Sequence, residues 1–177
     1  VEFTHFNALA QFTNADWVPQ TMQSWSVPDG DHTVLAHCAF MQRGRQENYF
    51  TANRPASSFE TDRKVFLGDT EYGSWANPLG LQREALTNSE ALRGDNIAAL
   101  LCPLGVLEPG AKARLITQLG QAPDVAAALP GIRAYRAGSA VDEALAALGR
   151  FWEGYLSAIQ VETPVASLNS MLNVHNP

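Results

Sequence analysis

The side chains best suited to metal binding or nucleophilic chemistry are four histidines and two cysteines, and they are scattered along the chain. They are His5, His32, His37, His175, Cys38 and Cys102. No two histidines have the spacing of metal ligands on one helix face. The cysteines are too few for a disulfide framework or a four-thiolate site, and their apolar surroundings are typical of small core residues. The sequence therefore predicts neither a metal site nor a cofactor.

Catalytic motifs are absent from the sequence. No G-x-S-x-G elbow and no G-x-x-x-x-G-K-[ST] phosphate loop occurs. A Ser/His/Asp triad stays open, because the order of its members varies between folds. Four carboxylates in the middle of the chain could serve acid–base chemistry, but their spacing does not pair them, and loop solvation is the simpler role. They are Asp62, Asp69, Glu71 and Asp95.

Tryptophan and glutamine together indicate a different chemistry, the binding of sugar. Aromatic rings stack on the apolar faces of sugars, and amides hold the hydroxyls. Trp17 and Trp25 flank Gln20 and Gln23, and Trp75 stands near an asparagine. For each tryptophan alone, core packing is the simpler role.

The elements that must position these residues fall into two groups. Apolar runs bounded by turn residues predict strands at 33–41, 48–52, 97–101 and 113–119, and their spacing favours a sandwich. Residues 57–96 are long and irregular, which suggests a short helix, packing on a neighbour or a ligand.

Helices are predicted from Ser139 onward. Ser139 is the expected N-cap of a helix with an apolar stripe, which we expect to be buried. The stripe is Val141, Leu145, Leu148, Trp152, Tyr155 and Ile159. Thr163-Pro164 predicts a second helix start, with its buried side at Val165, Leu168, Met171 and Leu172.

Length and charge narrow the class of protein. The chain has 177 residues, with 12 Lys and Arg against 18 Asp and Glu. An acidic chain without a basic stripe argues against a nucleic-acid partner, and no apolar run reaches the roughly 20 residues that span a bilayer. The sequence opens at Val1 without an initiator Met and closes at Pro177, so we expect a piece of a longer protein.

A series of short strings, in order, resembles the glycoside phosphorylases of the cellobiose phosphorylase type, glycoside hydrolase family 94. They are DRKVFLG at 62–68, WANPL at 75–79, LTNS at 86–89, RGDNIAAL at 93–100, LEPG at 107–110 and LG at 119–120, with VEF at 1–3 and MLNVHN at 171–176. The string FTANRP at 50–55 resembles the cellobionic acid phosphorylases.

The resemblance implies a mainly β chain: part of an N-terminal β super-sandwich over residues 1–138, then linker helices over 139–177 that lead to an (α/α) barrel catalytic domain outside this chain. Members of the family cleave a β-linked disaccharide with inorganic phosphate and invert the anomeric centre to give an α-sugar 1-phosphate. The general acid, an Asp, lies in the barrel. The resemblance thus implies a non-catalytic portion of a cytoplasmic, homodimeric enzyme that needs no cofactor.

The resemblance also bears on the sugar-binding residues. A sandwich loop of the family carries a Gln-Arg pair that contacts the sugar, and the pair falls at Met22 and Gln23 here, so the Arg is absent. Together with the tryptophans, this makes Gln20 and Gln23 the candidate substrate contacts, on an expected loop from 16 to 26. Two alternatives stay open: a stand-alone carbohydrate-binding module, and the equivalent region of a cyclic glucan synthase.

Overall fold

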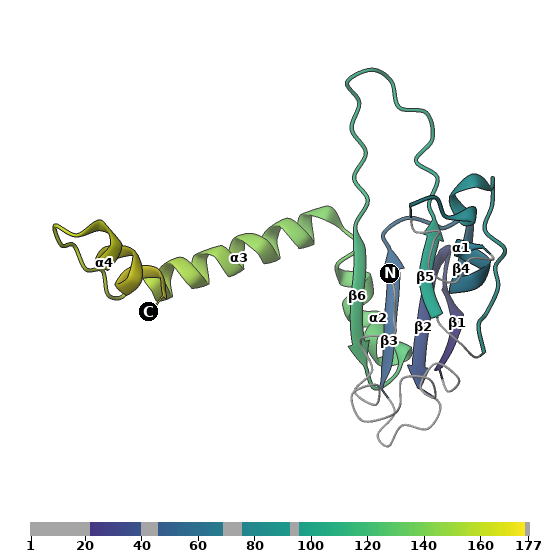
Figure 1. Cartoon of the computed structure of the whole chain (residues 1–177), viewed down its shortest axis with the longest axis horizontal. Coiled ribbons are helices and arrows are strands. Elements are labelled where there is room, and N and C mark those ends of the chain that lie inside the picture. Colours follow the sequence, from purple (N-terminus) through teal and green to yellow (C-terminus); the bar gives the residue numbers. More distant parts are fainter. Residues whose placement is uncertain (1–21, 40–45, 69–75, 93–95, 176–177) are drawn as a thin grey trace. The chain divides into compact units, whose positions relative to one another are not determined.

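The computed structural model describes residues 22–39, 46–68, 76–92 and 96–175 (Figure 1). The chain divides into two compact units, the first ending at Arg136 and the second beginning at Ala137. None of the helices in these described ranges is long and apolar enough to cross a membrane.

A four-stranded antiparallel sheet forms the centre of the first unit. Its strands are β1 (Met22–Asp29), β2 (His32–Ala39), β3 (Glu47–Ala52) and β6 (Thr117–Ala122), in the order β1-β2-β3-β6. The β1–β2 turn needs a positive φ, which Gly30 supplies at 62°. Successive side chains alternate between the two faces, so Val34 and Ala36 lie on one face, and Leu35 and His37 on the other.

Helix α2 (Val125–Ala134) covers one face of this sheet. Its buried Val125 and Ile132 pack on Val34 and Ala36 of β2, and half-buried side chains complete the cluster. Those are Trp25, Val27, Tyr49, Ala128 and Leu129. Asp124 caps the helix by accepting from the backbone N–H of Ala127 at 2.7 Å.

A second antiparallel sheet covers the opposite face. It consists of β4 (Ser58–Asp62) and β5 (Asn96–Leu101). Leu35 of β2 and Ala98 of β5 are buried against each other, and Phe50, Phe59 and Leu100 pack around them. The two stacked sheets confirm the predicted β-sandwich followed by helices, with strands where 33–39, 48–52 and 97–101 were expected, and residues 40 and 41 of the first predicted strand lie outside the described residues.

The irregular stretch between β4 and β5 holds short helices: α1 (Arg63–Leu67) and the 3₁₀ helix η3 (Leu79–Gln82). The Asp62 carboxylate caps α1 by accepting from the backbone N–H groups of Lys64 and Val65. The ring of Phe66 occupies the space that a Cβ at Gly80 would need, so η3 packs tightly on α1.

A long segment, residues 102–116, links β5 to β6 and has no regular structure (Figure 1). The prediction of a strand over 113–119 is wrong for 113–116, because β6 begins at Thr117. The reason lies in its partner: β3 ends at Ala52, and Asn53 bonds Ile116 through both its backbone N–H and its side-chain oxygen. Beyond Asn53 the pairing of β3 with β6 ends, and no strand among the described residues pairs with 113–116.

The second unit contains helix α3 (Gly138–Leu156), helix α4 (Ala166–Ser170) and a π-helical turn η4 (Met171–His175). The helix predicted from 139 is present, but Ser139 is not its cap: α3 follows Ala137, which makes no side-chain capping bond. The stripe predicted to be buried is exposed in this chain, with Leu145 at 61%, Trp152 at 48% and Ile159 at 77%. A single amphipathic helix buries its stripe only against a partner, and α3 has no buried residue.

The last helix begins two residues later than Thr163-Pro164 predicts. Thr163 lies outside the helix, where its backbone N–H donates to the side-chain oxygen of Asn169 and its carbonyl accepts from the Asn169 amide. Its hydroxyl accepts from the N–H of Val165, the residue that precedes α4. Val165, Leu168 and Met171, expected on a buried side, are exposed at 54%, 36% and 47%.

Candidate functional site

The residues predicted to contact sugar lie in or near β1. Gln20, Trp17 and Trp75 fall outside the described residues. Gln23 lies in β1 opposite Cys38 and is half-buried. The expected loop from 16 to 26 is therefore wrong for residues 22–26, because β1 pairs with β2 from Met22 onward.

Trp25 shares the α2 face of β1 with Gln23, by strand alternation. It packs on the cluster of Val34 and Ala36, so its role is core packing rather than an open stacking platform. Trp152 lies on α3 and contacts the rings of Phe151 and Tyr155 edge-on.

A serine and a histidine meet between the two sheets. The hydroxyl of Ser24 lies 3.0 Å from Nδ1 of His37, its cross-strand partner. The side-chain amide of Asn96, from β5, donates to the same hydroxyl at 2.9 Å. The Ser24 oxygen accepts from Asn96, and the hydrogen bond between Ser24 and Nδ1 is donated by the hydroxyl or by the ring, according to the tautomer of His37.

Burial excludes a nucleophilic role for this pair as it stands. Ser24, His37 and Asn96 are each 0% exposed, so no substrate carbonyl or phosphate reaches the hydroxyl. Desolvation lowers the pKa of His37 to about 4, partly offset by a backbone hydrogen bond with Gln23, so the ring is neutral at physiological pH. The cluster fixes the packing of the two layers.

Glu60 of β4 is a buried carboxylate that the sequence did not single out, and it is 1% exposed. Its Oε1 accepts from the backbone N–H groups of Thr61 and Asp62 at 3.0 and 3.1 Å, and its Oε2 accepts from the hydroxyl of Thr87. Each oxygen is thus engaged in holding the strand's irregular end against residues 87–89. Of the four carboxylates considered from the sequence, Asp62 caps α1, and Asp69, Glu71 and Asp95 lie outside the described residues.

An ion pair at the buried Asp29 carboxylate fastens α2 to the β1–β2 hairpin. Asp29, whose side chain is 6% exposed, binds Nη2 of Arg133 at 2.5 Å and Nη1 of Arg136 at 2.8 Å. The Arg133 hydrogen bond, with help from Arg136, holds the pKa of the Asp29 carboxyl below its usual value against the opposing effect of burial. At the other end of α2, Glu47 of β3 accepts from the N–H of Val125 at 2.8 Å. Both carboxylates serve the fold.

Metal-binding residues do not gather in the part of the chain that the structure describes: no three His, Cys, Asp or Glu side chains there lie together as a metal site. Cys38 is buried, whereas Cys102 is half-buried beside the Arg54 carbonyl, and neither forms a disulfide. Burial raises the pKa of the Cys102 thiol.

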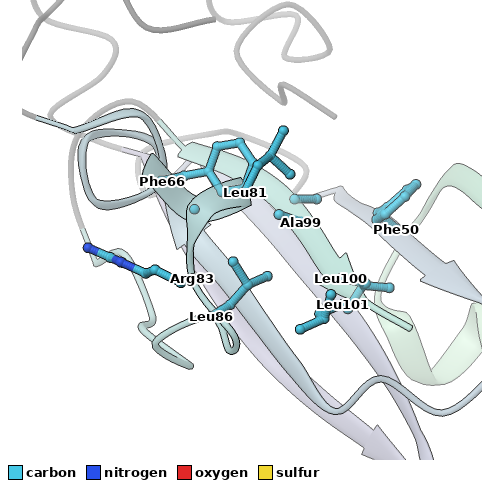
Figure 2. Close-up of a pocket in the computed structure, with 10 residues that line it drawn as sticks. Phe50, Phe66, Leu81, Arg83, Leu86, Ala99, Leu100 and Leu101 are labelled. Carbon is cyan, nitrogen blue, oxygen red and sulfur yellow. The ribbon is translucent and has the colours of Figure 1, made fainter. Parts of the chain in front are cut away.

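An apolar groove of about 340 Å³ lies along β5 (Figure 2). Four consecutive residues of β5, Ala98 to Leu101, line it. Phe50 of β3 lies on one side, and Phe66, Leu81 and Leu86 lie on the other, with Arg83 at the rim. The lining has a single charged side chain, so the groove suits an apolar occupant and offers no set of polar groups for a sugar.

Fold and site together define a β-sandwich followed by helices. The sequence model of the family described as "Glycosyl hydrolase 94, supersandwich domain" matches residues 1–138. The chain is 31% identical over 125 residues to an N,N'-diacetylchitobiose phosphorylase of Vibrio furnissii, an alignment that covers 71% of this chain and 15% of the relative. The chain belongs to glycosyl hydrolase family 94, which confirms the resemblance, and it spans about 15% of the length of that relative.

Proposed function

We propose that this chain is the non-catalytic N-terminal sandwich portion of an inverting glycoside phosphorylase, with helices that lead to an (α/α) barrel. The parent enzyme cleaves a β-linked disaccharide with inorganic phosphate and releases an α-sugar 1-phosphate. The single observation that carries this proposal is the family match over residues 1–138, beside a relative that is itself named a phosphorylase.

The described side chains support the non-catalytic part of this proposal. An inverting reaction with phosphate needs an acid at the glycosidic oxygen and a site for the anion, both open to the substrate. Here Glu60, Asp29 and Glu47 are buried and engaged with the backbone or with arginine, and the Ser24–His37 pair is closed to solvent. Catalysis accordingly belongs to the barrel, and this chain supplies the support on which the barrel rests.

The proposed division places the sandwich at residues 1–138 and the linker helices at 139–177. For the substrate, the resemblance as a whole favours cellobiose or cellobionic acid and the FTANRP string favours cellobionic acid, whereas the relative's name points to N,N'-diacetylchitobiose. All three are β-linked disaccharides, and we propose cellobiose or cellobionic acid. The parent enzyme is further proposed to act as a homodimer in the cytoplasm without an added cofactor.

The first prediction concerns activity. We expect the purified 177-residue chain to release no sugar 1-phosphate from cellobiose, cellobionate or N,N'-diacetylchitobiose with phosphate. The full-length parent is expected to release it from one of the three, with the α configuration visible by NMR. The parent is the matched control in the same assay. Turnover by the isolated chain above background would contradict the non-catalytic assignment.

The second prediction concerns Gln20 and Gln23, which we propose contact the acceptor sugar in the full-length enzyme. Amides both donate and accept, which suits hydroxyl groups. Gln20→Ala and Gln23→Ala are expected to raise the KM for the acceptor in the synthetic direction several-fold and to leave the KM for phosphate in the reverse direction unchanged. Gln121→Ala, an exposed residue at the end of β6, is the control. Unchanged acceptor kinetics in both variants would remove these residues from the site.

A further inference from the structure

Two asparagines on the last helical segment bind the chain that leads into it. The side-chain oxygen of Asn173 accepts from the N–H of Val161, and its amide donates to the carbonyl of the same residue, both at 2.8 Å. Asn169 binds Thr163 in the same way, at 2.8 and 3.0 Å. Each amide therefore pairs with both backbone groups of one residue, as a neighbouring β-strand does. We call these two pairs the asparagine clamp.

The spacing of the clamp fits a helix on one side and an extended chain on the other. Asn169 and Asn173 are four residues apart, which is a rise of about 6 Å along a helix. Val161 and Thr163 are two residues apart, which spans about 6.6 Å in an extended chain. The later asparagine binds the earlier residue, so residues 161–163 run antiparallel to the helix (Figure 1). We call residues 161–163 the strap.

The π-helical turn η4 brings the two asparagines into line. Asn169 lies in α4 and Asn173 in η4. Four residues of an α-helix pass a full turn by about 40°, because one turn takes 3.6 residues. A π turn advances less per residue, since its hydrogen bonds span five residues rather than four. The change from α to π therefore turns Asn173 back towards the line of Asn169, as a straight strap requires.

The residue type indicates that the clamp, rather than the helix, determines these two positions. Asparagine is a poor residue for a helix interior, since its side chain competes with the backbone for hydrogen bonds. An amide side chain offers a donor and an acceptor together, which is what a peptide N–H and C=O need. Both asparagines are half-buried, whereas Ser170 between them is exposed, so both lie on the helix face that the strap covers.

The connection from α3 to the strap is also held by hydrogen bonds. The N–H of Ser157 donates to the Glu153 carbonyl at 2.9 Å. The side-chain amide of Gln160 donates to the Leu156 carbonyl at 2.5 Å. Hydrogen bonds thus continue from the end of α3, through the strap, to the start of α4, which favours a fixed angle between these helices over a free linker.

We propose that the asparagine clamp is a positioning device. It fixes the direction of α4 and η4 relative to α3, and in the parent enzyme it fixes the direction in which the chain enters the catalytic barrel. The barrel part rests on the proposed function, because it needs a barrel that follows these helices. Asn169 and Asn173 are positioning residues, since they act through Val161 and Thr163 and not on the substrate.

The first test is amide hydrogen exchange, measured by NMR in the 177-residue chain. We expect the amides of Val161 and Thr163 to be protected at least ~10-fold more than that of Glu162, whose N–H points away from the helix in an extended strap. Asn173→Ala should remove the protection at Val161, and Asn169→Ala should remove it at Thr163. Equal exchange of the three amides in the unmodified chain, or protection that survives both substitutions, would overturn the clamp.

Two further variants keep this test specific. Asn173→Asp keeps the acceptor oxygen and loses the donor, so it is expected to retain part of the Val161 protection that Asn173→Ala removes. Ser170→Ala changes the exposed residue between the two asparagines and is expected to change neither amide. Loss of protection in Ser170→Ala as large as in Asn173→Ala would contradict the proposal.

The second test is kinetic and uses the full-length enzyme with Asn169→Ala and Asn173→Ala combined. We expect kcat for phosphorolysis to fall by ~10-fold or more, because misplaced parts of an active site cost rate even when the change lies far from the chemistry. The KM for phosphate should change by less than about 2-fold, and the Tm by less than about 2 °C, so that the loss is not one of folding.

The outcomes of the kinetic test separate this proposal from the proposed function. An unchanged kcat in the double variant would overturn the positioning role in the parent enzyme. An unmodified full-length protein without phosphorolysis would refute the proposed function and with it the barrel part, whereas the exchange test, which needs no activity, decides the clamp itself.

Discussion

At His37, burial rather than a catalytic neighbour sets the protonation state. The ring shares a hydroxyl hydrogen bond with Ser24, as in a nucleophile–base pair, yet both residues are closed to solvent. Moving this ring from water into the space between two sheets disfavours its charged form. A Ser–His hydrogen bond like that of a hydrolase therefore stabilises the packing of two sheets here. Solvent exposure distinguishes a catalytic pair from a structural one.

The third prediction follows from this neutral histidine. Its pKa is about 4 in the folded chain against 6.5 as the ordinary value, so between these pH values the unfolded chain binds a proton that the folded chain does not. The free energy of unfolding is thus expected to fall as the pH drops from about 6.5 to about 4, by at most about 3 kcal/mol from this group. Above pH 6.5 the group contributes no pH dependence.

Urea denaturation at a series of pH values measures this slope. His37→Gln is expected to flatten it between pH 6.5 and 4, and His32→Gln, in the half-buried start of the same strand, is the control. If His37→Gln does not fold, NMR titration of the parent chain decides instead. A His37 ring that titrates near pH 6.5 in the folded protein would contradict the prediction.

Among the elements, α3 departs most from its prediction, because its apolar stripe was expected to be buried and is exposed. Two aromatic residues of its stripe, Trp152 and Tyr155, contact each other and the neighbouring Phe151, and all three are about half exposed or more. The polar residues mostly lie elsewhere on the helix, so α3 is amphipathic as predicted, but its stripe is not buried within the part of the chain that the structure describes. In a phosphorylase of the proposed kind, the barrel would cover the stripe.

The fourth prediction uses Trp152 to measure this difference. Because its side chain is 48% exposed, Trp152→Ala is expected to lower the stability of the 177-residue chain by less than about 1 kcal/mol. In the full-length enzyme we expect a loss of roughly 3–5 kcal/mol, the range for a fully buried tryptophan. Urea denaturation followed by circular dichroism compares the two, with exposed Glu153→Ala as control. Equal small losses in both proteins would mean that the stripe stays uncovered.

Elements with strong local signals were predictable, and those fixed by distant contacts were not. Strands β2, β3 and β5 coincide with apolar runs between turn residues, and the local pattern suffices there. Helix α2 contains Pro130-Gly131, which argues against a helix locally; burial of Val125 and Ile132 on the sheet, with caps from Asp124 and Glu47, outweighs that propensity.

The sequence predicted which residue types could bind sugar, but it did not predict where the fold places them. The sequence identified Gln23 and Trp25 as sugar-binding types, and the register of β1 places Trp25 in the core. The meeting of Ser24 with Asn96, and of Glu60 with Thr87, depends on strands far apart in the chain, for which spacing offers no signal. Strand β4 reads SFETD with a single apolar residue, so the sequence around Glu60 offers no hint of its burial.

For the molecule as a whole, we expect the first unit to be stable without the second. The first unit contains its own core, and the ion pair of Asp29 closes it through Arg133 and Arg136, the last residue before the boundary. Residues up to Arg136 should therefore determine the stability of the sandwich.

The fifth prediction is a truncation pair. A chain ending at Gly138 is expected to melt within about 2 °C of the 177-residue chain, because it keeps α2 and both arginines. A chain ending at Gly131 loses buried Ile132 as well as Arg133 and Arg136, and its Tm should fall by at least about 5 °C. Differential scanning calorimetry measures both. A large fall in the Tm of the chain ending at Gly138 would show instead that the helical unit stabilises the sandwich.

The ion pair between Asp29 and Arg133 joins residues 104 positions apart in the chain, and β6 reaches β3 only after the whole second layer has intervened. The meander of β1, β2 and β3 closes short loops, whereas the return of β6 and α2 closes a long one at a higher entropic cost. Folding is thus expected to run in an order, with the meander early and the α2 clasp late, at the slow rate typical of non-local β topology. Contacts made after the rate-limiting step govern how fast a protein opens rather than how fast it forms. The ion pairs of Asp29 with Arg133 and Arg136 would then slow unfolding and so set the lifetime of the folded sandwich.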